Sequence, residues 1–221
     1  MTRARALLHR LRASRSGVAM TEFALSLPLL LTAGLWGVET AHLAMIHMRV
    51  SQLAIHIADN GSRIGDTSTL EDRKIYESDL NDLLLGANIQ AGDALDFFQH
   101  GRAIISSLEV EPGSDRQYIH WQRCKGVKVF PSSYGDEGDT MANGMGPPDE
   151  QVSAEPGDAV IFVEVAYEYQ PLVSARFVGA TTIKATSAFM VRDDRDLSQI
   201  YQRDPGSPDP VSNCSAHDGF S

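Results

Sequence analysis

Residues 15–36, RSGVAMTEFALSLPLLLTAGLW, decide the fold of this chain. From Val18 to Val38 the only charged side chain is that of Glu22. A helix rises about 1.5 Å per residue, so this apolar stretch would extend about 31 Å, which matches the ~30 Å hydrocarbon core of a bilayer. We therefore predict a membrane-spanning helix over about 18–38.

The regions on either side of this stretch carry opposite charges. Residues 1–17 contain five arginines and no acidic residue, whereas the remainder contains 14 basic and 29 acidic residues, a net charge of −15. Positive residues stay on the cytoplasmic side, so we expect a cytoplasmic N-terminus and an external C-terminal domain. An acidic domain repels phosphate backbones, which argues against a nucleic-acid partner. A cleaved signal peptide ending near 32–34 would also explain the arginines, but the apolar pattern continues beyond that point.

The helical pattern extends to about Ile64. One apolar stripe with helical spacing consists of Trp36, Leu43, Ile46, Val50, Leu53, Ile57 and Ile64. This predicts a single helix over 18–64, with its first half in lipid, its second half on a soluble domain and a kink at Pro28. His42 and His56 would lie about 21 Å apart along it, so they cannot share a metal ion.

The region 65–203 alternates between helix and strand signals. A capping-box-like start at 69–72 and a following apolar side predict a second helix over 67–86. The period then changes to two, which predicts strands at 103–110, 117–124, 158–170 and 180–192, with 125–130 as a possible fifth element. We therefore expect an α+β fold in which the long helix packs on a four- to five-stranded antiparallel sheet. The charged run at 192–196 is interpreted as a solvated turn.

Two segments of this region contain many turn-forming residues. Residues 131–158 are rich in glycine, proline and acidic side chains, which predicts an exposed, flexible loop. Residues 204–221 predict an extended C-terminal tail.

The only cysteines are Cys124 and Cys214, and outside the membrane we expect them to form a disulfide that fastens the tail to the sheet. Two free thiols or bridges between subunits are the alternatives.

Recognisable catalytic and cofactor motifs are missing from the sequence. It contains no G-x-S-x-G, H-E-x-x-H, P-loop or paired C-x-x-C pattern. The acidic residues at 136–139 do not have the spacing of a calcium-binding loop. We expect neither enzymatic activity nor a metal or cofactor.

A family resemblance rests on the N-terminal residues. An arginine-rich leader ends in Gly17, VAMTEFALSLPLLL follows, and Glu22 is the fifth residue after the glycine. This N-terminus resembles those of type IV pilin-like proteins, and most closely the TadE/TadG-like minor pseudopilins of the Flp (tight-adherence) pilus. The segments IHWQRCKG at 119–126, VEVAYEYQPLV at 163–173 and VRDDRDLSQIY at 191–201 are similar to longer family members and occur in the expected order.

The resemblance implies a processing site and a set of partners. A prepilin peptidase would cleave between Gly17 and Val18, on the cytoplasmic face of the bacterial inner membrane. The new amino group of Val18 would then pair with Glu22 of the same or a neighbouring subunit. The C-terminal domain would be periplasmic, and the protein would join other pilins in pilus assembly and surface adhesion. The alternative is a permanently anchored, unprocessed periplasmic binding module that never enters a pilus.

Overall fold

The computed structural model of the chain describes residues 9, 16–66, 72–191 and 194–220. Most of the basic leader, and the predicted helix start at 69–71, lie outside the described residues. The chain divides into two compact units, which are described separately below. The first unit consists of residues 1–44 and 171–179, and the second consists of residues 45–170 and 180–221.

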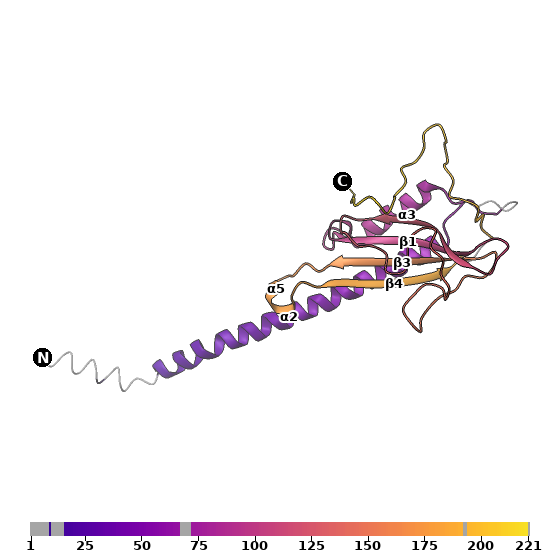
Figure 1. The fold of residues 1–221 in the computed structure, drawn as a ribbon. Coiled ribbons are helices and arrows are strands. Elements are labelled where there is room, and N and C mark those ends of the chain that lie inside the picture. The colour runs from indigo at the N-terminus through magenta and orange to yellow at the C-terminus, as the bar shows by residue number, and fades with distance from the viewer. Residues whose placement is uncertain (1–8, 10–15, 67–71, 192–193, 221) are drawn as a thin grey trace. The chain divides into compact units, whose positions relative to one another are not determined.

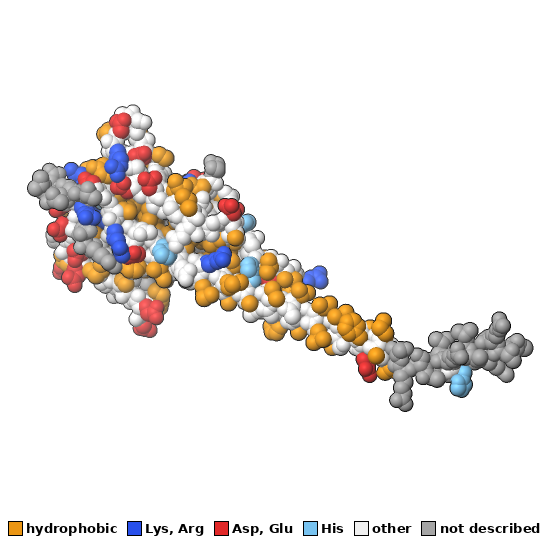
Figure 2. All heavy atoms as spheres, turned by 180° about the vertical axis from the view of Figure 1, so that it is seen from behind, with side chains coloured by type: hydrophobic (Ala, Val, Ile, Leu, Met, Phe, Trp, Pro, Cys, Tyr) orange, Lys and Arg blue, Asp and Glu red, His pale blue; other side chains and the backbone are white. Residues whose placement is uncertain are grey.

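The long predicted helix is present as α2, Ser16–Gly61, and it continues through Pro28 without a break (Figure 1). In the first unit, α2 is long and apolar enough to cross a membrane, which is consistent with a single-pass anchor. Figure 2 shows hydrophobic side chains along this part of the helix. The large exposed ones up to residue 38 are Val18, Met20, Phe23, Leu25, Leu29, Leu30, Leu31, Leu35, Trp36 and Val38.

The first unit also contains α5, Ala175–Val178, within the connection between two strands of the second unit. Ser174 is the N-cap of this short helix, and its hydroxyl accepts a hydrogen bond from the backbone N–H of Arg176. This connection contacts α2 through the backbone N–H groups of residues 172–174, which donate hydrogen bonds to Glu39.

The second unit is built on a four-stranded antiparallel sheet with the strand order β2-β1-β3-β4. Its strands are β1 Gly101–Val110, β2 Gln117–Lys125, β3 Ala159–Glu168 and β4 Thr182–Met190. They confirm the four strands predicted from the two-residue period. Residues 126–130 do not extend the sheet: β2 includes Lys125 but ends before Gly126, whose φ of +125° brings the backbone close to Gly101.

One face of the sheet is covered by the second half of α2. A Cβ placed on Gly61 would lie 3.1 Å from Ile161 of β3 and 3.4 Å from Leu83, so a larger side chain would push these elements apart. The buried apolar side chains of this helical segment are Ile46, Val50, Leu53, Ala54, Ile57 and Ala58. Burying each of the large aliphatic ones contributes about 1.5 to 3 kcal/mol, which holds the helix on the sheet.

The second helix is α3, Glu77–Ala91. It begins ten residues after the predicted start at residue 67. Residues 73–76 are extended instead, because Arg73 bridges to Arg195 and Tyr76 bridges to Tyr201. The side chain of Asp79 then accepts a hydrogen bond from the N–H of Tyr76 and fixes the first turn of α3. A shorter helix, α4, Phe97–His100, leads into β1.

The opposite face of the sheet is covered by residues 131–158. Met145 and Ala154 of this segment are buried in a cluster with Leu108, Ile119 and Phe162 of the strands. The segment is therefore not simply exposed to solvent, as the sequence suggested. Coverage on both faces explains why nine of the ten residues of β3 are buried.

Arg195 closes the C-terminal end of α2. Its guanidinium donates hydrogen bonds to the carbonyl oxygens of Gly61, at 3.3 Å, and Ile64, at 2.8 Å, and the residue is 9% exposed. A cation at a helix C-terminus satisfies carbonyl groups that have no partner within the helix. The run at 192–196 is thus not only a solvated turn, because Arg195 is part of the core.

Candidate functional site

The predicted processing site lies at the beginning of α2. Gly17 and Val18 are both exposed, and Val18 is already in helical conformation. A Cβ added to Gly17 would meet no atom within 4 Å, so no described side chain packs against this glycine on that side. The Gly17–Val18 peptide bond lies within the helix, so a protease would have to unwind the first turn of α2 to bind it in an extended conformation.

Glu22 differs from the other polar side chains of the apolar stretch. The three hydroxyl groups of this stretch, those of Thr21, Ser26 and Thr32, donate hydrogen bonds back to carbonyl oxygens of the same helix, as does Thr40 just beyond the stretch. Such bonds satisfy hydroxyl groups where water is missing. Glu22 makes no hydrogen bond or ion pair with any other described residue, although it lies in the same stretch.

The spacing of Val18 and Glu22 determines what this site can do chemically. Residues four apart lie on the same face of a helix, one turn from each other. Cleavage before Val18 would place a positively charged amine on the face that carries the carboxylate. It would also bring Glu22 close to the new N-terminal end of the helix, where the helix dipole favours a negative charge.

Comparisons of the chain with protein-family models, with curated proteins and with solved structures found no match. The resemblance to TadE/TadG-like pseudopilins therefore rests on the N-terminal motif and on the ordered segments that follow it.

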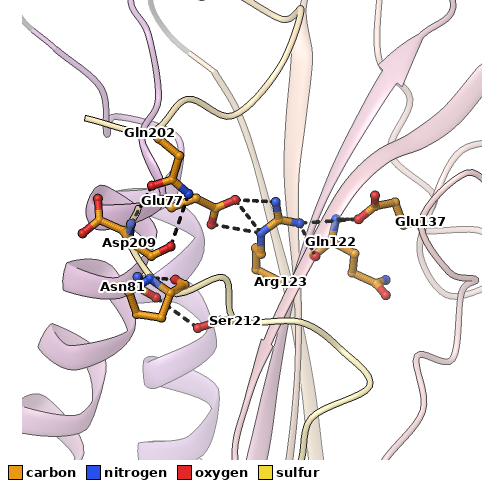
Figure 3. A network of polar contacts seen from close by, with 9 residues as sticks. Glu77, Asn81, Gln122, Arg123, Glu137, Gln202, Asp209 and Ser212 are labelled. Atoms are coloured by element: carbon orange, nitrogen blue, oxygen red, sulfur yellow. Dashed lines mark hydrogen bonds and ion pairs between the residues drawn. The ribbon is translucent and has the colours of Figure 1, made fainter. Parts of the chain in front are cut away.

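A buried ion pair joins α3 to β2 in the second unit (Figure 3). The Arg123 guanidinium binds the Glu77 carboxylate through Nη2–Oε1 at 2.6 Å and through Nε at 3.1 and 3.2 Å from its two oxygens. Arg123 also donates to the carbonyl oxygen of Gln122 and contacts Glu137 at 3.5 Å. The side chains of Glu77 and Arg123 are 4% and 11% exposed, so this pair acts as a structural link.

The C-terminal tail is fixed to the domain by the predicted disulfide, which is present between Cys124 and Cys214. Nearby, the buried guanidinium of Arg102 donates to the carbonyl oxygens of Cys214, at 2.6 Å, and Ala216, at 2.8 Å. Burial lowers the pKa of Arg102, and Asp218 opposes this effect. The tail also contributes to the network of Figure 3, where Asn81 of α3 donates to the carbonyl oxygen of Pro210.

Ser107, Glu109 and His120 form a small polar cluster on β1 and β2. The Ser107 hydroxyl donates to Glu109 Oε1 at 2.6 Å, and His120 Nδ1 lies 2.8 Å from Glu109 Oε2. A nucleophilic serine needs a base as its hydrogen-bond partner and access to substrate. Here Ser107 and His120 each bind the Glu109 carboxylate and not one another, and Ser107 is only 1% exposed. The cluster therefore has the arrangement of a structural network.

This cluster makes the stability of the domain depend on pH. The hydrogen bond to Glu109 raises the pKa of His120 above its usual 6.5, against the opposing effect of burial, and the charge of Glu137 contributes. The folded protein binds the proton more tightly, so the stabilisation is complete below pH 6.5 and is lost as pH rises through the folded pKa. We expect unfolding free energy to fall by about 1 kcal/mol over this interval, measured by urea unfolding across a pH series.

Two variants test the origin of this slope. His120→Gln removes the titrating group, and Glu109→Gln removes the carboxylate that raises its pKa. Both are expected to flatten the decline above pH 6.5. A decline of wild-type size in both variants would show that another group is responsible.

Metal ligands do not gather in the described part of the chain: it contains no group of three histidine, cysteine or acidic side chains able to hold a metal ion.

A cavity of about 520 Å³ lies between the end of α2 and α3. Its polar lining includes His56, Asn60, Arg63, Asp79, Asp82 and Gln90. Arg63 is held by both carboxylate oxygens of Asp59, at 2.6 and 2.8 Å.

Proposed function

We propose that this protein is a membrane-anchored TadE/TadG-like minor pseudopilin that is processed after Gly17 and takes part in Flp pilus assembly and surface adhesion. One observation carries the proposal: in an apolar stretch whose hydroxyl groups are all satisfied, Glu22 has no described partner and lies one turn after Val18. A carboxylate in lipid costs about 2.5 to 3.5 kcal/mol at mid-depth and less near the interface, and is rarely kept without a partner. The amine created by cleavage would supply one.

Further features agree with this proposal. A long helix that is exposed and apolar in its first half, and packed on an antiparallel sheet in its second half, suits a pilin-like subunit. The disulfide between Cys124 and Cys214 suits an oxidising compartment such as the periplasm. The five arginines before Gly17 favour a cytoplasmic N-terminus.

Processing is tested by the intact mass of the chain purified from membranes of cells that contain an active prepilin peptidase. We expect a chain that begins at Val18. Gly17→Leu is expected to block cleavage, and Gly34→Leu is its matched control, because a Cβ at either glycine meets no atom within 4 Å. Glu22→Gln is expected to be cleaved normally but to fail in pilus incorporation and surface attachment, because it cannot pair as a charge with the amine.

The outcomes separate the competing interpretations. A chain that begins at Met1 would contradict the pseudopilin proposal and favour the permanently anchored binding module. A chain that begins near residue 35 would identify an ordinary signal peptide. Normal assembly of the Glu22→Gln variant would refute the pairing of Glu22 with the new amine.

A further inference from the structure

A second carboxylate, Glu39, lies directly after the apolar stretch and is completely buried, with 0% exposure. It accepts hydrogen bonds from three consecutive backbone N–H groups. Oε2 binds Val173 at 2.6 Å and Ser174 at 3.2 Å, and Oε1 binds Leu172 at 3.2 Å. Hydrogen bonds from backbone amides to an ionised carboxylate are among the stronger ones in proteins, so Glu39 fastens residues 171–179 to α2.

The fastened segment is longer than its place in the sheet requires. Glu168 of β3 pairs directly with Thr182 of β4, and an antiparallel hairpin can be closed by about two to five residues. Residues 169–181 connect them instead and include α5, which lies beside α2 in Figure 1. An extended connection that is held in one place by a buried carboxyl group points to a function beyond closing the sheet.

The surface of this segment combines apolar and basic side chains. Leu172 is 61% exposed and Val173 is 39% exposed, although both are large and apolar. Arg176, on α5, is also exposed. Apolar side chains beside a cation are typical of surfaces that enter the boundary between lipid headgroups and acyl chains.

The position of Glu39 on the helix shows what surrounds the segment. The apolar stretch from Val18 to Val38 would extend about 31 Å, the thickness of the hydrocarbon core, so Glu39 would lie at its outer boundary. Trp36, an amphipathic residue that favours this boundary, lies one turn earlier. The segment that Glu39 holds would therefore lie at headgroup depth.

We infer that residues 171–179 form a membrane-surface contact, in which Leu172 and Val173 enter the bilayer interface, Arg176 meets lipid phosphates and Glu39 holds the segment at that depth. The partner is the phospholipid bilayer. This inference rests on the proposed membrane anchoring but does not depend on pilus function or on cleavage at Gly17.

Depth-dependent fluorescence quenching tests it, with the full chain reconstituted in phosphatidylcholine–phosphatidylglycerol vesicles that carry brominated acyl chains. The chain has two tryptophans, so Trp121→Phe leaves Trp36 as a probe of the anchor. Adding Trp36→Phe and Val173→Trp creates a probe of the segment. Val211→Trp in the same background is the matched control, since Val211 and Val173 are both 39% exposed.

We expect strong quenching of Trp36, several-fold stronger quenching at position 173 than at position 211, and the largest effect at 173 from bromines near the headgroup. Glu39→Ala is expected to reduce the quenching at 173, and Glu39→Gln, which keeps one acceptor oxygen, to reduce it less. The circular-dichroism spectrum of each variant, compared with that of the wild type, verifies its fold.

The remaining outcomes overturn the inference in distinguishable ways. Quenching of Trp36 without quenching at 173 would leave the anchor intact and refute the membrane-surface contact. Equal quenching at 173 and 211 would refute a contact specific to this segment. Unchanged quenching at 173 in both Glu39 variants would refute the holding role of Glu39. Lack of quenching of Trp36 would refute the anchor itself.

Discussion

Replacing Arg123 by methionine is expected to lower the free energy of unfolding by about 3 to 5 kcal/mol, because it leaves the Glu77 carboxylate buried without its counter-ion. The side chain of Glu77 is only 4% exposed, so water cannot replace the lost guanidinium. The pair also joins two elements that are far apart in sequence, α3 and β2. Its loss would therefore weaken the contact between the helix layer and the sheet.

The measurement is urea unfolding of the full chain in a non-ionic detergent. In a Trp36→Phe background the buried Trp121 is the only tryptophan and reports on the second unit. Arg116→Met is the matched control, because Arg116 pairs with Glu111 at the β1–β2 turn but is 59% exposed. An exposed pair contributes about 0 to 1 kcal/mol, so equal losses in the two variants would contradict the proposed role of burial.

The double variant Glu77→Leu/Arg123→Met separates the cost of an unpaired charge from the value of the pair. Both charges are then absent, and a buried ion pair replaced by apolar side chains often costs little. We expect the double variant to be clearly more stable than Arg123→Met alone. If the two variants are equally unstable, the lost packing of the Arg123 side chain, and not the unpaired Glu77 carboxylate, is the main cause of the destabilisation.

Removing the disulfide with Cys124→Ala/Cys214→Ala is expected to have an effect of similar size. The bridge closes a loop with a sequence separation of 90 residues. In the chain-entropy model a loop of this length stabilises the fold by roughly 4 to 5 kcal/mol, and measured values are often smaller. We expect a loss of about 2 to 5 kcal/mol in the same urea experiment.

The disulfide also supports a neighbouring buried charge, which makes the expected loss depend on Arg102. Its guanidinium is bound by carbonyl oxygens of the tail, at Cys214 and Ala216. Without the bridge, the tail can leave and expose this group. Arg102→Met should therefore cost less in the disulfide-free protein than in the wild type. Labelling of two free thiols in unreduced wild-type protein would show that the disulfide is absent. If Arg102→Met lowers the free energy of unfolding equally with and without the disulfide, Arg102 and the bridge are not coupled.

The elements that the sequence predicted well have periodic local patterns. The apolar stripe of α2 and the two-residue alternation of β1 to β4 are properties of single segments, so they could be identified without tertiary information. The disulfide could be predicted because the chain has only two cysteines and an expected external domain.

The features that escaped prediction depend on residues far away in the sequence. The start of α3 moved because Tyr76 pairs with Tyr201, and no local pattern around 67–76 contains that information. Glu39 resembles an ordinary polar residue after a membrane span, since its three N–H partners lie more than 130 residues further on. The local sequence around Arg195 indicates a solvated turn for the same reason: its acceptors are distant carbonyl oxygens at and just after the end of α2.

The covering of β2 has a consequence for self-association. The outer edge of this strand is already occupied: the N–H of Cys124 donates to Ser212 of the tail, and that of Ile119 donates to Asp139 of the 131–158 segment. An open sheet edge recruits strands from other molecules and leads to aggregation. Since its own chain fills this edge, the protein cannot be extended there by strand addition. Contacts between copies must use other surfaces, such as the exposed half of α2 or the opposite sheet edge at β4, and the tail prevents sheet extension at β2 alone.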